Sequence, residues 1–162
     1  MRIAKIAAKM IEISQGNLHD IEHFLKVHAY ARLIGQLEQL APDRQFILEA
    51  AALLHDIACP LCREKYGNAS GKHQEQESAP LVEVFLEGTG VDEAMKERIS
   101  YLVCHHHTYT DVNGLDYQIL LEADFLVNAD ESQMSEAAIR NARETFFKTR
   151  TGTELLNSIY QV

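Results

Sequence analysis

Apolar residues recur every three or four positions along most of this 162-residue chain, which is the spacing of one face of an α-helix. Stretches in which apolar and polar residues alternate, as they do in half-buried strands, are nearly absent. Glycine, proline and asparagine interrupt the helical pattern and divide it into segments. We expect helices over 1–13, 18–40, 42–57, 80–86, 92–104, 115–127, 133–148 and 153–160. The sequence therefore predicts an all-α fold.

The segment 42–57 is apolar on nearly every side, which is typical of a helix buried at the centre of a bundle. Pro42 suits the first helical position, and Pro60 is expected to end the helix. Residues 63–72 are rich in glycine, serine and asparagine and are expected to form a loop. Because no internal repeat or linker is present, the sequence predicts a single domain over residues 1–162.

Charge and composition narrow the classes of function. Lys and Arg number 15 and Asp and Glu number 24, which gives a formal net charge of −9. Such a chain repels duplex DNA at long range, so we expect no duplex nucleic acid as a partner. No stretch approaches 18 uninterrupted apolar residues, so we expect no membrane span. Three cysteines are too few for a disulfide scaffold, which favours a reducing compartment and predicts a cytoplasmic protein.

Two carboxylates stand inside apolar helical sequence. Asp56 follows His55 near the end of the segment 42–57, and Asp124 lies within the apolar run 120–127. Burying a carboxylate costs several kcal/mol unless it is paired, hydrogen-bonded or bound to a cation. His23, on the preceding long helix, completes a set of two imidazoles and two carboxylates, which suits a divalent transition metal ion. Any one of these histidines taken alone would more often be a core residue than a ligand.

The order and surroundings of these residues resemble the HD-domain superfamily of metal-dependent phosphohydrolases. The paired motif of that family usually reads Ala-x-Leu-Leu-His-Asp-Ile, and residues 51–57 read Ala-Ala-Leu-Leu-His-Asp-Ile. Its closing motif, Ala-Asp in an apolar helix, is matched by residues 123–124. In the family, the first histidine tends to be followed by a basic residue, a Val and a small residue at +3, +4 and +8. After His23 these positions hold Lys26, Val27 and Ala31.

The resemblance spans residues 18–130 and implies a helical bundle of the HD-domain type, with C-terminal helices over 133–160 beyond this core. It also implies that a divalent transition metal (Fe, Mn, Ni, Zn or Co) is held by four residues: His23, His55, Asp56 and Asp124.

Two further histidines on the helix of His23 compete with it less well. His28 lies on the apolar face of the same helix but lacks the basic residue and Val that follow His23 at +3 and +4, so we assign it to the core. His19 lies one turn before His23 and is expected at the rim or the surface. His23 therefore remains the first ligand that the resemblance implies.

Three consecutive histidines follow Cys104. Members of the superfamily with two metal ions carry additional histidines at comparable places, which makes His105 and His106 candidates for a second site or its rim, while the role of His107 stays open. The alternative is a helix C-terminus at which imidazoles interact favourably with the helix dipole. Two-metal members have one more histidine about four residues before a small pair. Here that position is Gln74, with His73 one residue away, so we expect one ion rather than two.

A cationic stretch with Arg63, Lys65 and Lys72 follows Cys59-Pro60-Leu61-Cys62. The two cysteines lack a second pair to complete a zinc site. The cationic residues either bind a substrate phosphate near the metal or belong to a solvated loop, and the sequence favours neither.

The resemblance implies hydrolysis of a phosphate ester or anhydride of a small molecule, most simply a nucleotide. In this account the ion polarises a phosphoryl oxygen and lowers the pKa of a bound water. Asp56 or Glu77 positions that water or takes its proton. The phosphate charge is neutralised by Lys26, Arg63, Lys65 and a rim histidine from 105–107.

Two rival interpretations remain open. One is the oxygenase branch of the same superfamily, which uses a di-iron centre and needs a full set of six ligands, against which Gln74 counts. The other is a non-catalytic nucleotide-binding or interaction module that keeps a structural metal. Such a module would gain stability from apolar residues in place of Asp56 and Asp124, which disfavours it. A homodimer through the terminal helices stays open, although nothing in the sequence argues for it.

Overall fold

The computed structural model describes residues 2–162, and within that range the chain forms nine α-helices and no strand. The all-α prediction is confirmed; Met1, which we included in the first helix, lies outside the described residues. The helices are α1 (Arg2–Ile13), α2 (Leu18–Leu37), α3 (Pro42–Leu54), α4 (Cys59–Tyr66), α5 (Gly71–Leu86), α6 (Glu93–His105), α7 (Leu115–Glu131), α8 (Glu136–Thr145) and α9 (Arg150–Tyr160).

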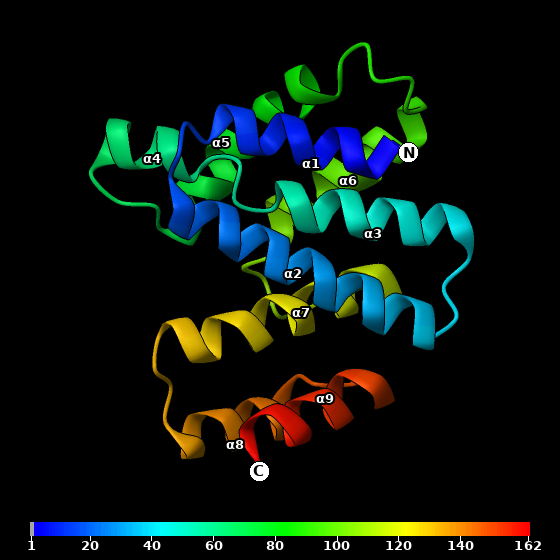
Figure 1. Ribbon diagram of the computed structural model, residues 1–162, viewed down its shortest axis with the longest axis vertical. Helices are drawn as coiled ribbons and strands as arrows, with labels where there is room; N and C mark the ends of the chain where they lie inside the picture. The colour runs from blue at the N-terminus through cyan, green and yellow to red at the C-terminus, as the bar shows by residue number, and fades with distance from the viewer. Residues whose placement is uncertain (1) are drawn as a thin grey trace.

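Helix α3 lies at the centre of the bundle. Figure 1 shows α1, α3, α2 and α7 as successive layers along the long axis of the molecule, with α8 and α9 at the end opposite to α1. Helices α5 and α6 pack against each other, and α6 also packs on α3. Every residue from Ile47 to Leu54 is buried, as are nearly all residues from Asp116 to Val127 in α7. Helix α3, which leads directly to His55 and Asp56, and helix α7, which carries Asp124, are therefore the two most deeply buried helices.

The segment Pro42–Tyr66 is apolar and long enough to cross a membrane by composition alone, but 72% of its most apolar window is buried inside the protein. A turn at residues 55–58 also divides it into α3 and α4. Its apolar side chains form the centre of the core, as expected for the central helix.

The prediction that Pro60 ends the central helix is wrong. Helix α3 ends at Leu54, and Pro60 lies in the first turn of α4. The first turn of a helix has no intrahelical partner for its N–H groups, so proline is tolerated there. As a result, His55 and Asp56 lie in the turn between two helices rather than inside one.

The predicted loop over 63–72 is shorter than expected. Helix α4 continues to Tyr66 and ends at Gly67, whose φ of +75° is the left-handed conformation that glycine adopts readily. Ser70 caps α5, which then runs through Pro80. Pro80 is exposed, so the backbone carbonyl that it leaves without a helical partner can be solvated. The sequence predicts a break here correctly, but it does not predict α4, and α5 begins at Gly71 rather than at Pro80.

A buried carboxylate ties the C-terminal helices to α7. Glu122 is fully buried and accepts hydrogen bonds from the backbone N–H groups of Lys148 and Thr149, at 2.7 and 2.9 Å, and from the Thr149 hydroxyl. It also accepts a hydrogen bond from the Gln118 side chain at 2.7 Å. The segment between α8 and α9 is thereby fixed on α7 by a side chain whose charge is satisfied.

Replacing Glu122 by alanine should therefore lower the free energy of unfolding by about 3 kcal/mol, because it leaves buried N–H and hydroxyl groups without partners. Urea denaturation followed by circular dichroism would measure this. Glu136→Ala, at an exposed position, should change stability by less than about 0.5 kcal/mol. A loss for Glu122→Ala as small as that of Glu136→Ala would contradict the anchoring role.

Candidate metal centre

Four segments bring imidazoles and carboxylates together in the core. His23 comes from the second turn of α2, His55 and Asp56 from the turn after α3, and Asp124 from α7. His106 joins them from the turn directly after α6. Adjacent residues of a helix point about 100° apart, so the end of α3 at Leu54 is what allows both His55 and Asp56 to face one centre.

The first cluster is formed by His23, His55, Asp56 and Asp124. The Nε2 atoms of His23 and His55 lie 3.0 Å apart. Each of these nitrogens lies 3.3 or 3.4 Å from Oδ2 of Asp56 and from Oδ1 of Asp124. Ligands about 2.1 Å from a metal ion are separated by roughly 3.0 Å along an octahedral edge and roughly 3.4 Å along a tetrahedral edge. The observed spacings therefore match those of ligands that share one ion.

Hydrogen bonds on the far side of each ring set its orientation. Nδ1 of His23 donates to Oε2 of Glu131 at 2.8 Å. Nδ1 of His55 and Nδ1 of His106 donate to backbone carbonyls, those of Ala52 and Val103, each at 2.7 Å. Because the proton is held at Nδ1 in each ring, the lone pair of Nε2 is available toward the centre.

Asp56 also faces a second group. Its Oδ1 lies 3.3 Å from Nε2 of His106, whereas its Oδ2 faces His23 and His55. Two groups of ligating atoms result, one from His23, His55 and Asp124 and one from His55, Asp56 and His106. His55 belongs to both groups, and Asp56 faces His23 with one oxygen and His106 with the other.

The unpaired atoms of this centre fit a divalent cation. Among the described residues, Nε2 of His106 and Oδ1 of Asp124 are buried without a hydrogen-bond partner, which costs about 1–3 kcal/mol for each group. When both rings are neutral, the lone pairs of His23 and His55 also face each other at 3.0 Å. A cation between them would relieve this repulsion and satisfy the carboxylate, and imidazole with carboxylate is a donor set that transition metals accept.

The electrostatics keep both carboxylates ionised. Burial by itself would raise the pKa of Asp56, but His55 and His106 hold it well below its ordinary value. Burial likewise opposes ionisation of Asp124, yet His23 and His55 lower its pKa. Burial would lower the pKa of His55, but Asp56 and Asp124 raise it well above the ordinary value. The pKa of His23 is raised in the same way, so protons compete with a metal ion for these imidazoles.

His105 lies outside both ligand groups. Its Nδ1 donates to the carbonyl of Tyr101, and its ring stacks on the Tyr101 ring at 4.0 Å between centroids. Of the two histidines proposed for a second site or its rim, His106 is the one placed at the centre. His107 packs against His106, and partial desolvation there lowers the pKa of His107 to about 4.

The remaining histidines also lie outside the ligand groups. His19 is exposed, and His28 lies near Glu49 and Arg32 with its pKa lowered by burial. His73 stacks on Tyr66. Gln74, at the position where two-metal members carry a histidine, is buried and donates to the carbonyl of Ala69. Gln74 is therefore engaged with the backbone.

The proposed catalytic cations and Glu77 are paired with other side chains. Arg63 makes two hydrogen bonds to Asp20, at 2.7 and 2.8 Å. Lys65 donates to Glu77 at 2.5 Å, and Tyr66 donates to the same carboxylate oxygen. Neither Lys65 nor Glu77 belongs to the ligand groups, and their catalytic roles stay predictions. Lys26 is half-exposed, and its Nζ lies 3.9 Å from Oε1 of Glu131.

Glu131 is a residue that the sequence analysis missed. It lies seven positions after Asp124, two turns along the same face of α7, and we had ended that helix at residue 127. A carboxylate that accepts the Nδ1–H of a ligating histidine orients the ring and raises its basicity. The spacing from Asp124 was a signal that could have identified it.

Glu131→Ala should therefore weaken metal binding by about 10- to 100-fold, because His23 loses the acceptor that orients it. Glu131→Gln should fall between this variant and the wild type, since its amide oxygen still accepts. Competition with a chromophoric chelator would measure the affinities. Asp130→Asn removes an exposed charge one residue away and serves as the matched control. Equal affinities for all four proteins would rule out the positioning role.

A cavity of about 160 Å³ reaches the centre beside Asp56. Apolar side chains form most of its lining, among them Met10, Phe24, Ile57 and Leu61. The Asp56 side chain is 27% exposed, compared with 6% for Asp124 and 0% for His55. Asp56 is therefore the carboxylate through which the centre is open to small molecules.

Comparisons with known proteins agree with this architecture. The HD domain family matches residues 20–139, and no curated protein matches the chain. The chain is similar to the crystal structure of a predicted HD superfamily hydrolase from an uncultured Thermotogales bacterium. Sequence identity is 26%, the match covers 98% of this chain and 83% of the other, and the TM-score is 0.68. With about three quarters of its length matched and its His and Asp residues gathered at one centre, the chain belongs to the HD-domain family, within a superfamily of hydrolases that use a divalent metal.

Proposed function

We propose that the protein is a metal-dependent phosphohydrolase that cleaves a phosphate ester or anhydride of a small molecule, with a nucleotide as the favoured substrate. The observation that carries this proposal is the buried cluster of two Nε2 atoms and two carboxylates beside a cavity that opens at Asp56. When bound, a divalent ion supplies a Lewis acid for the phosphoryl group and a water of lowered pKa.

His23, His55, Asp56 and Asp124 would hold this ion. Fe, Mn, Ni, Zn and Co all accept such a donor set. We propose one ion rather than two, because the second group adds only His106 to residues of the first cluster, and Gln74 is bonded to the backbone.

The side chains near the opening have separate roles in this proposal. Asp56 is the exposed member of the cluster and would orient the attacking water or accept its proton. Lys26, which lies 3.9 Å from Glu131, and Arg63, once released from its ion pair with Asp20, would neutralise phosphate oxygens. The apolar lining of the cavity would receive a flat base more readily than a sugar with many hydroxyl groups.

The proposed partner is thus a small phosphorylated molecule. The net charge of −9 argues against duplex nucleic acid. Three free cysteines are consistent with a cytoplasmic location.

The test is phosphate release from a panel of nucleotides, sugar phosphates and p-nitrophenyl phosphate, assayed with Mn²⁺, Ni²⁺, Co²⁺, Fe²⁺ and Zn²⁺. We expect turnover of at least one substrate, its loss with EDTA, and its recovery when the metal is restored. His55→Ala should be inactive under every condition. Absence of phosphate release across the panel, or release that persists in His55→Ala, would overturn the proposal.

A further inference from the structure

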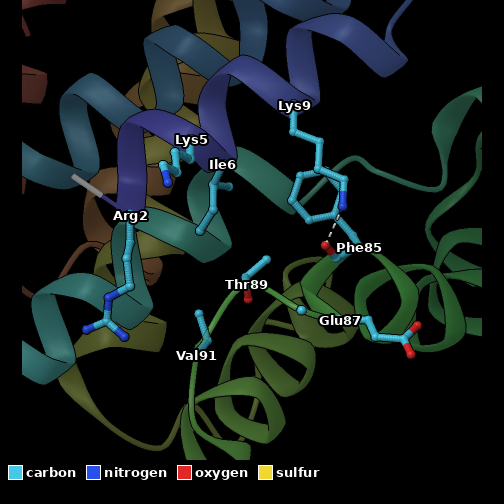
Figure 2. A pocket seen from close by; sticks show the side chains of 9 residues that line it. Arg2, Lys5, Ile6, Lys9, Phe85, Glu87, Thr89 and Val91 are labelled. Carbon is cyan, nitrogen blue, oxygen red and sulfur yellow. Dashed lines mark hydrogen bonds between the residues drawn. The ribbon is translucent and has the colours of Figure 1, made fainter.

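A larger cavity lies between the N-terminal half of α1 and the segment that follows α5. It measures about 430 Å³ and shares no residue with the metal centre. Figure 2 shows Arg2, Lys5 and Lys9 on α1, with Thr89 and Val91 on the segment across the cavity and Lys9 reaching Phe85. This volume lies within the range of sites that bind small molecules, roughly 300–1,000 Å³.

The cations of this cavity differ from those elsewhere in the chain. Of the 15 Lys and Arg residues, ten form ion pairs with carboxylates. Five form none within residues 2–162, and three of these five line this one cavity: Arg2, Lys5 and Lys9. In a chain with 24 carboxylates, three unpaired cations around one cavity leave it locally positive.

Two of these three cations are held in place without being neutralised. The guanidinium of Arg2 lies over the Phe46 ring at 4.5 Å, and Nζ of Lys9 donates to the carbonyl of Phe85 at 2.7 Å. Lys5, between them on the same face, makes neither kind of contact within the described residues. Glu87 is the one carboxylate of the lining, and in Figure 2 it points away from α1.

Apolar groups complete the lining. Ile6 and Val91 are buried on opposite sides of the cavity, and the Phe85 ring packs beside Lys9. A ligand that matches this surface carries negative charge for Lys5 and Arg2 and an apolar body for Ile6 and Val91.

We propose that this cavity is a binding site for a small organic phosphate with an apolar or aromatic body, separate from the metal centre. A phosphate dianion would neutralise the positive charge of the three cations. The apolar lining would favour an organic phosphate over inorganic phosphate. The proposal does not depend on hydrolysis at the metal centre.

The test is an NMR titration of the full chain with phenyl phosphate in the presence of EDTA, which prevents metal-dependent turnover. We expect shifts of the amide signals of Ile6, Gly88, Thr89 and Val91. Inorganic phosphate and phenol, titrated separately, should each bind at least tenfold more weakly than phenyl phosphate. The double variant Arg2→Ala, Lys5→Ala should lose at least tenfold in affinity, and both positions are exposed, so the fold should be kept.

Lys148→Ala is the matched control, because Lys148 is also exposed and without a carboxylate partner among the described residues but lies outside the cavity. It should bind phenyl phosphate as the wild type does. Shifts confined to the surroundings of Asp56 and His106 would overturn the proposal. So would unchanged affinity of the double variant, or equal affinity for inorganic phosphate and phenyl phosphate.

Discussion

Asp56→Asn should lower the rate of phosphate ester hydrolysis by about 10²- to 10⁴-fold, the equivalent of several kcal/mol of transition-state stabilisation by a metal ion. Asp56 faces His23 and His55 with one oxygen and His106 with the other, and its side chain is the exposed member of the cluster. An asparagine keeps the shape but loses the charge. Its NH₂ group, moreover, cannot ligate a cation.

The measurement is kcat on whichever substrate the phosphate panel identifies, together with metal content and the circular dichroism spectrum. The spectrum should remain helical. Asp43→Asn removes an exposed carboxylate from the first turn of α3, the helix that precedes Asp56, and should keep the wild-type rate. If Asp56→Asn hydrolyses the substrate as fast as Asp43→Asn does, Asp56 does not belong to the catalytic site.

A divalent transition metal should raise the thermal unfolding midpoint by roughly 5–10 °C. A ligand at 100 times its Kd stabilises the folded state by about 2.7 kcal/mol, and each kcal/mol moves the midpoint of a domain of this size by about 2–4 °C. Differential scanning calorimetry with EDTA and with added Mn²⁺ or Ni²⁺ would measure the shift. Mg²⁺ prefers an octahedron of oxygens and should shift the midpoint far less.

The same experiment has a predicted pH dependence. In the metal-free protein the raised pKa values of His23 and His55 contribute stability at low pH, which is lost as pH rises through those values. A metal ion displaces these protons. Its stabilising effect should therefore increase as the pH rises from about 5.5 to about 8.5. His55→Ala should show no metal-dependent shift at any pH. A shift of equal size in His55→Ala would place the bound metal elsewhere.

The helices with continuous apolar sequence are the part of the fold that the sequence predicts most reliably. The segment 42–57 was expected as a buried helix because nearly every side of it is apolar, and the structure buries α3. Helix α7, expected over 115–127 with an apolar run at its end, is buried as well. The residues at which helices begin and end are predicted less well. The sequence predicts helix boundaries at Pro60 and Pro80. In the structure Pro60 lies in the first turn of α4, and Pro80 lies inside α5 and faces solvent. Whether a proline interrupts a helix depends on whether its lost hydrogen bond can be replaced, which local sequence does not state.

For the candidate site, the demand for a cation follows from the sequence. Asp56 and Asp124 both stand in strongly apolar sequence, and a buried carboxylate requires a compensating charge wherever the helices are placed. The resemblance of the motifs then implied His23 and His55 as partners.

The packing of the helices determines which neighbouring side chains face the centre. It selects His106 over His105 because α6 ends between them and the two rings point to different surroundings. It places Glu131 on His23, and it pairs Glu77 with Lys65. Helix periodicity is a local property of the chain, whereas each of these contacts joins a side chain to another segment and depends on how the helices pack.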